Sequence, residues 1–267
     1  MDYAKALKCA TLAQEIYYDF AAIKFSEFVN SRPELIQNDA TDTQCAILPG
    51  KAPDATYIVF RGTEKNADWK TNVEFTRALF EIRWTEVSEM TPPPDDDKPR
   101  PRQILPAQPD GGQTDLAPGA PRAKMHQGFV NAYMSVQDYI HRYLRNNEVT
   151  NLTITGHSLG GALATLCAID LQLTYAGQYA MDIYTFGAPK VGNPEFRDLF
   201  TQHIPRSYRF HNALDIVPDL PRPWQGYRHV NTEYRLGSRL SWQFFSRRVS
   251  DHYMKSYIAA LRAAANL

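Results

Sequence analysis

The chain has 267 residues, of which 43% are hydrophobic, so it has enough apolar material for a large buried core. Its 29 Lys and Arg residues balance its 29 Asp and Glu residues, which gives a formal net charge of zero. A nucleic-acid-binding protein needs a basic surface to neutralise phosphates, so this composition argues against that class.

The cysteines and the N-terminus bear on the cellular compartment. Cys9, Cys45 and Cys167 are too few and too widely spaced for a disulfide framework, which favours a reducing compartment. The N-terminus lacks the apolar run and the small-residue cleavage site of a signal peptide. We therefore expect a cytoplasmic protein, with secretion independent of a signal peptide as the alternative. The low-charge stretch 149–181 carries polar residues and adjacent glycines, so we expect no transmembrane segment.

Short β-branched runs alternate with longer helical runs along the chain. This alternation predicts crossover units and therefore a single α/β domain, residues 1–267, with a mostly parallel central sheet flanked by helices. The expected strands are Gln44–Leu48, Thr56–Phe60, Leu152–Thr155, Ile183–Phe186, Tyr208–His211 and Tyr227–Tyr234. The expected helices are Tyr3–Val29, Phe129–Asn146, Ala162–Ala176, Glu195–His203 and His252–Ala264.

The segment Gly156-His157-Ser158-Leu159-Gly160 lies between an expected strand and an expected helix. A serine on a sharp strand-to-helix turn needs small neighbours because the strand and the helix approach closely, and glycines two residues on either side meet that need. The serine hydroxyl then projects at the helix N-terminus, where backbone N–H groups favour developing negative charge. The pattern predicts Ser158 as the nucleophile of an α/β-hydrolase fold.

The partners of this serine are expected later in the chain, because triads of this fold follow the order Ser, Asp or Glu, His. The acid should lie at the carboxyl end of a later strand. Asp215 meets this condition, and Asp219 is the nearby alternative. Of the histidines, only His229 and His252 follow Asp215. His229 lies within a strand-like run, whereas His252 lies at a loop-to-helix junction from which it can reach the nucleophile, so we expect His252 as the base.

An oxyanion hole needs two N–H donors. The residue after the nucleophile, Leu159, should supply one of them. The other should come from the turn after an earlier strand, where Gly62 allows a tight turn and Thr63 can offer both its N–H and its hydroxyl. We therefore expect Leu159 and Thr63 to form the oxyanion hole.

The order and content of several sequence blocks resemble the class 3 lipases, the fungal-lipase-like branch of the α/β-hydrolases. The blocks are VFRGT (Val59–Thr63), Asp68-Trp69, MHQGF (Met125–Phe129), ITGHSLGGALA (Ile154–Ala164), YTFGAPKVGNPEF (Tyr184–Phe196), DIVPDLP (Asp215–Pro221) and a final Asp251-His252 followed by a helix.

The resemblance implies a catalytic triad of Ser158, Asp215 and His252, with Thr63 and Leu159 as the oxyanion hole. It also implies a lipid or ester substrate, either acylglycerols or other carboxylic esters, with no cofactor and no metal. We further expect transient contact with a lipid–water interface. The sequence departs from the family at Asn72, where an acidic residue often stands.

Several alternatives share these sequence features. The triad does not separate a lipase from a phospholipase A1 or a feruloyl-type esterase, because the acyl pocket selects the substrate. A lipase that acts as a secreted bacterial toxin would have the same sequence features. A catalytically inactive lipase-like binding protein is disfavoured, because such proteins usually lack a triad member and all three candidates are present here.

Residues 91–122 contain half of the chain's 18 prolines. Proline removes backbone donors and disfavours helix in the residue before it, so we expect Thr91–Arg122 to be an irregular insertion in the domain. The insertion falls between Thr63 and Met125, and in the family both flanks belong to the rim of the catalytic site. We expect it to cap the mouth of the site; the alternative is a solvated surface loop.

Overall fold

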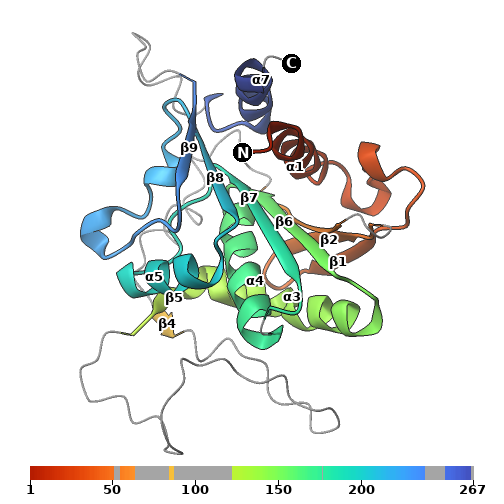
Figure 1. Ribbon diagram of the computed structural model, residues 1–267, viewed down its shortest axis with the longest axis horizontal. Helices are drawn as coiled ribbons and strands as arrows, with labels where there is room; N and C mark the ends of the chain where they lie inside the picture. Colours follow the sequence, from red (N-terminus) through yellow and green to blue (C-terminus); the bar gives the residue numbers. More distant parts are fainter. Residues whose placement is uncertain (51–54, 64–83, 87–121, 176, 238–249, 266–267) are drawn as a thin grey trace, which may run out of the picture.

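The computed structural model describes residues 1–50, 55–63, 84–86, 122–175, 177–237 and 250–265, which are coloured in Figure 1. A seven-stranded sheet of order β1-β2-β3-β6-β7-β8-β9 forms the centre of these ranges. Strands β3, β6, β7, β8 and β9 run parallel to one another, and β1 and β2 add to the sheet in antiparallel pairs. The sheet strands are β1 (Glu34–Asn38), β2 (Thr43–Leu48), β3 (Thr56–Phe60), β6 (Asn151–His157), β7 (Ala180–Phe186), β8 (Ser207–Asn212) and β9 (Glu233–Leu236).

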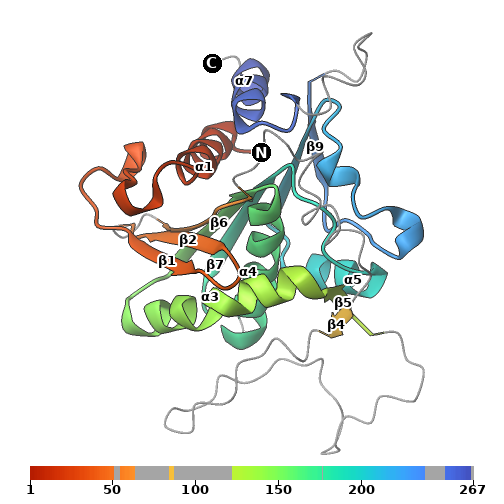
Figure 2. The same ribbon diagram turned by 180° about the vertical axis from the view of Figure 1, so that it is seen from behind.

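Helices cover both faces of the sheet, as Figures 1 and 2 show. On one face, α1 (Tyr3–Glu15) lies beside α7 (Met254–Ala265). On the other face lie α3 (Gln127–Asn146), α4 (Leu159–Tyr175) and α5 (Pro194–His203), together with a small antiparallel pair, β4 (Trp84–Glu86) and β5 (Lys124–His126). This is the mostly parallel α/β architecture that the sequence predicts. No helix in the described ranges is long and apolar enough to cross a membrane.

The two faces of the sheet are buried in two separate apolar clusters, because successive side chains of a strand point to opposite faces. In β3, Ile58 and Phe60 belong to the cluster that contains the buried residues of α3 and α4. Tyr57 and Val59 belong to the cluster that contains those of α1 and α7. Because helices cover both faces of the sheet, we expect a site at the carboxyl ends of its parallel strands.

Two predicted elements differ from the structure by more than three residues at one end. The helix expected over Tyr3–Val29 ends at Glu15, and two short 3-10 helices follow it, Phe20–Ala22 and Ser26–Phe28. The Asp19 carboxylate caps the first of them by accepting the N–H of Ala21, a local bond that competes with a continuing α-helix. The strand expected over Tyr227–Tyr234 begins only at Glu233. Arg228 pairs through an isolated bridge with Gly192 instead.

Strand β1 (Glu34–Asn38) was not predicted from the sequence. Only Ile36 of its five residues is buried, so the strand lacks the alternating hydrophobic pattern that identifies a half-buried strand. Several predicted features cannot be compared with the structure. Asp68, Trp69, Asn72 and the insertion Thr91–Arg122, apart from Arg122 itself, lie outside the described residues.

Candidate active site

Ser158 occupies the turn between β6 and α4 with a left-handed backbone, at φ 57°. Such a conformation is costly for a residue with a side chain and persists only when its surroundings hold it. The Ser158 N–H donates to the carbonyl oxygen of Phe186 at 2.9 Å, which ties the turn to the end of β7. The sequence prediction of a strained strand-to-helix turn is therefore correct.

The glycines on either side of Ser158 are required by close backbone contacts. A Cβ atom on Gly156 would lie 2.3 Å from the carbonyl oxygen of Gly160. A Cβ atom on Gly160 would lie 2.4 Å from the carbonyl oxygen of Phe60, at the end of β3. Larger residues at either position would push α4 away from the sheet and move the serine.

The structure brings Ser158, His252 and Asp215 together. The Ser158 Oγ lies 2.9 Å from His252 Nε2, and His252 Nδ1 lies 2.9 Å and 3.0 Å from the two carboxylate oxygens of Asp215. The serine hydroxyl therefore donates to Nε2, and the N–H at Nδ1 donates to the carboxylate. Ser158 follows β6, Asp215 follows β8, and His252 lies in the turn before α7, so the three come from distant parts of the chain.

All three side chains are buried, and Ser158 is only 1% exposed. Burial strengthens the hydrogen bonds between them, because little water competes for the donors and acceptors.

The Asp215 carboxylate has two further donors. The Tyr257 hydroxyl donates to one oxygen at 2.5 Å, and the N–H of Val217 donates to the other at 2.9 Å. Burial alone would raise the pKa of Asp215, but the nearby His252 and these hydrogen bonds outweigh burial and hold that pKa below its usual value. Asp215 is therefore ionised and can stabilise a positively charged His252.

Tyr257 was not identified from the sequence. It lies within α7, where a tyrosine among apolar residues is typical of a core residue. No local signal distinguishes such a residue from one that contacts a carboxylate across the fold.

The two alternative residues occupy other environments. Asp219 is exposed at the end of the short turn Val217–Asp219. His229 Nε2 donates to the carbonyl oxygen of Pro218 at 2.5 Å. Burial, with Arg209 and Lys190 nearby, lowers the pKa of His229 well below its usual value. The geometry thus favours Asp215 and His252 over Asp219 and His229.

The two expected oxyanion donors lie, like Ser158, at the carboxyl ends of the parallel strands. Leu159 is the first residue of α4, so its N–H has no acceptor within the helix. Thr63 is half-buried and follows β3, which runs parallel beside β6 with Phe60 opposite Gly156. The turn packs closely on the serine turn, because a Cβ atom on Gly62 would lie 2.6 Å from the carbonyl oxygen of His157.

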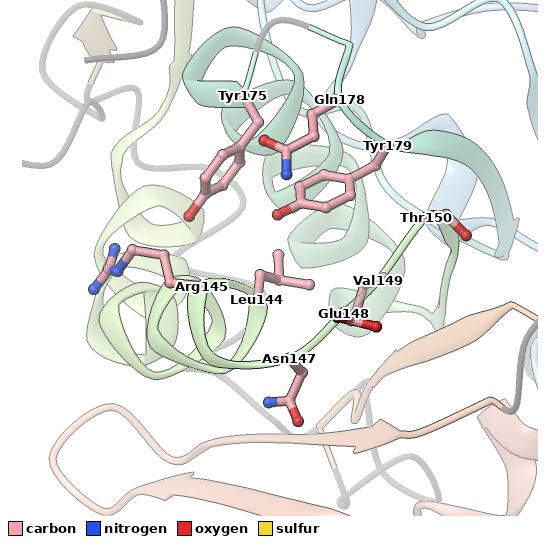
Figure 3. Close-up of a pocket in the computed structure, with 9 residues that line it drawn as sticks. All are labelled: Leu144, Arg145, Asn147, Glu148, Val149, Thr150, Tyr175, Gln178 and Tyr179. Carbon is pink, nitrogen blue, oxygen red and sulfur yellow. The ribbon is translucent and has the colours of Figure 1, made fainter. Parts of the chain in front are cut away.

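A pocket of about 540 Å³, drawn in Figure 3, lies beside the start of β6. The rings of Tyr175 and Tyr179 meet edge to face beside it, and Thr150, just before β6, lines it. Ser158 follows the other end of β6, roughly 20 Å away along the strand. This pocket is therefore separate from the serine site. Within the described ranges, no group of three or more His, Cys, Asp or Glu side chains is arranged to hold a metal ion.

Comparison with known proteins identifies the family. Residues 57–224 match the family described as lipase (class 3), which covers more than half of the chain. The chain is 39% identical over 116 residues to secreted mono- and diacylglycerol lipase 1 from Fusarium solani, covering 42% of this chain and 34% of that protein. It is 27% identical over 199 residues to a lipase from Rhizomucor miehei, covering 72% of this chain and 45% of that lipase. The chain thus spans less than half the length of these two relatives.

The solved structures agree with this result at the level of the fold. The lipase from Rhizopus microsporus var. chinensis superposes with a TM-score of 0.64 at 23% sequence identity, covering 97% of this chain and 85% of that one. The protein described here therefore belongs to the class 3 lipase family, with the α/β-hydrolase fold of the fungal lipases.

Proposed function

We propose that this protein hydrolyses carboxylic esters of acylglycerols through an acyl-enzyme intermediate on Ser158. The observation that carries the proposal is the continuous hydrogen-bond chain from Ser158 through His252 to Asp215. Nucleophile, base and orienting acid are within hydrogen-bond distance of one another, which is the arrangement that activates a serine hydroxyl. The lipase relatives support a carboxylic-ester substrate.

In the first half of the reaction, the Ser158 Oγ attacks the ester carbonyl carbon while its proton moves to His252 Nε2. Asp215 keeps the proton of His252 on Nδ1 and stabilises the imidazolium that forms. The carbonyl oxygen of the ester becomes negatively charged, and the N–H of Leu159 with the N–H and hydroxyl of Thr63 would stabilise it. His252 then protonates the leaving glycerol oxygen, and the acyl group remains on Ser158.

In the second half, water replaces the alcohol. His252 removes a proton from the water molecule as its oxygen attacks the acyl carbon. The same donors at Thr63 and Leu159 stabilise the second oxyanion. The Oγ of Ser158 leaves and recovers its proton from His252, which releases the fatty acid and the starting enzyme.

Access to Ser158 requires a change in what covers it, because its side chain is buried. Contact with a lipid–water interface would supply the apolar surface that favours such an opening. The insertion Thr91–Arg122 as a cap over the site fits this need and stays a prediction.

The proposal is tested with the purified protein on emulsions of mono-, di- and triacylglycerols and on phosphatidylcholine vesicles. Fatty-acid release is measured for the wild-type protein and for Ser158→Ala. We expect release from acylglycerols by the wild-type protein alone. Release from phosphatidylcholine only would replace the acylglycerol proposal with a phospholipase A1 activity. Lipid binding without any hydrolysis would indicate the catalytically inactive alternative.

A further inference from the structure

The base His252 is held at its backbone as well as at its ring. His157, the residue before the nucleophile, places its Nε2 2.6 Å from the carbonyl oxygen of His252. A carbonyl oxygen can only accept, so Nε2 carries the proton and Nδ1 of His157 has a lone pair. The Tyr17 hydroxyl lies 2.9 Å from that Nδ1 and donates to it. A hydrogen-bond chain therefore runs from Tyr17 through His157 to the backbone of His252.

His157 cannot itself serve as an acid or base at neutral pH. Its side chain is 1% exposed, and burial, together with the neighbouring His252, lowers the pKa of His157 to about 3. The two imidazole rings are close, with centroids 4.5 Å apart. A positive charge on His157 would oppose the imidazolium that forms on His252, so a neutral ring of fixed tautomer is the state compatible with the reaction.

Tyr17 also contacts the turn that carries Thr63. Tyr17 follows the end of α1, and a Cβ atom on Gly62 would lie 2.1 Å from its hydroxyl oxygen. The Arg61 guanidinium donates to the carbonyl oxygen of Tyr17 at 3.2 Å, which fixes the tyrosine backbone to the same turn. The Tyr17 hydroxyl thus lies against both His157 and the turn that leads to Thr63.

We propose that Tyr17 is a positioning residue that holds His252 against Ser158 by acting through His157. The role rests on the proposed function, since it concerns the base of that reaction. His252 lies in the turn before α7, so its position depends on contacts that the turn makes with other elements. With Nδ1 bound to Asp215 and the carbonyl bound to His157, both ends of the residue are fixed. Small displacements of a reacting group cost large factors in rate.

Tyr17 lies outside residues 57–224, the part of the chain that matches the lipase family. Its contact with His157 joins residues 140 positions apart. The proposal therefore gives the segment that follows α1 a part in the reaction.

The test is Tyr17→Phe, which removes the hydroxyl and keeps the ring. We expect kcat for ester hydrolysis to fall by about 10- to 100-fold while KM changes by less than about twofold. The rate at which a serine-reactive phosphonate labels Ser158 should fall by a similar factor. Tyr18→Phe is the matched control, because Tyr18 is adjacent and 56% exposed, and it should keep the wild-type kcat and labelling rate.

A measurement independent of turnover checks the hydrogen-bond chain itself. In ¹⁵N-histidine NMR spectra, His157 of the wild-type protein should show a protonated Nε2 and a bare Nδ1 at neutral pH. Tyr17→Phe should shift the Nδ1 resonance, and Tyr18→Phe should leave it unchanged. An unaltered Nδ1 resonance in Tyr17→Phe would contradict the hydrogen bond.

The outcomes separate this proposal from the proposed function. If the wild-type protein hydrolyses esters and Tyr17→Phe has the same kcat, the positioning role is wrong and the triad stands. A lower melting temperature with an unchanged kcat would mean that Tyr17 only stabilises the fold, which also overturns the proposal. If the wild-type protein neither hydrolyses esters nor reacts with the phosphonate, both proposals fail together.

Discussion

The Tyr257 hydroxyl donates a 2.5 Å hydrogen bond to the Asp215 carboxylate, on the oxygen that lies 2.9 Å from His252 Nδ1. Both residues are buried, and burial, together with the nearby Asp215 carboxylate, raises the pKa of Tyr257 well above its usual value. The tyrosine therefore stays protonated at neutral pH and remains a donor to the carboxylate. It helps to keep a buried negative charge beside the base.

Tyr257→Phe should destabilise the protein and impair the acid. Loss of a hydrogen bond to a buried charged group costs about 1.5–3 kcal/mol, so the free energy of unfolding at pH 7 should fall by that amount. The pKa of Asp215 should rise toward its usual value, because one of the groups that lower it is gone. Chemical denaturation measures the first effect. An unfolding free energy equal to that of the wild-type protein would show that the bond contributes nothing.

Replacement of the two candidate acids should have unequal effects. Asp215→Asn should lower kcat by about 10⁴-fold, because an amide in this place favours the wrong tautomer of His252. Asp219→Asn should change kcat far less, because Asp219 is exposed at the surface. Steady-state kinetics of both variants on one soluble ester provide the comparison. If the order were reversed, Asp219 would be the acid and the assignment of Ser158 would be unaffected.

The expected oxyanion donor can be tested at its hydroxyl. Thr63→Ala should lower kcat by about 10²- to 10³-fold with little change in KM, because the hydroxyl would act only on the charged transition state. Thr63→Ser retains the hydroxyl and should lower kcat only slightly. A Thr63→Ala variant with a kcat within twofold of the wild-type value would show that the hydroxyl is not a donor.

Stability should depend on pH through His157. Its pKa is about 3 in the folded protein, whereas an unfolded histidine has a pKa near 6.5. Between these values the unfolded chain binds a proton that the folded protein does not, so the free energy of unfolding falls as pH falls. The slope from this group is about 1.4 kcal/mol per pH unit.

The control for this prediction is His157→Gln, which cannot titrate but retains an N–H donor for the carbonyl of His252. Its unfolding free energy should fall less steeply between pH 6 and pH 4.5 than that of the wild-type protein. Equal slopes for the two proteins would mean that His157 does not titrate in this way. Urea denaturation at several pH values provides the measurement.

The serine turn was predictable because its cause is local. Gly156 and Gly160 are required by contacts within and beside one strand-turn-helix unit, so the residue pattern alone predicts the turn. Asp215 and His252 followed from their order in the chain and their positions after expected strands and before an expected helix. The extent of α1 was predicted wrongly, because the chain leaves the α-helix after Glu15 and continues in short 3-10 helices, the first of which Asp19 caps.

The contacts that support the triad could not be predicted in the same way. Tyr257 and Asp215 are 42 positions apart, and Tyr17 and His157 are 140 positions apart. Neither tyrosine differs in its local sequence from an ordinary core or surface residue. Only the packing of α1 and α7 on the same face of the sheet brings these hydroxyls to the two histidines and the carboxylate.

The assignment of Ser158 as the nucleophile is tested most directly by covalent labelling. The purified protein is incubated with a serine-reactive phosphonate ester, and the modified residue is identified by mass spectrometry of its peptides. We expect a single adduct on Ser158, with loss of ester hydrolysis in proportion to labelling, and no adduct on Ser158→Ala, whose turnover should be lower by about 10⁶-fold. An adduct on another residue with Ser158 unmodified, or a Ser158→Ala variant that still hydrolyses esters at the wild-type rate, would contradict the account.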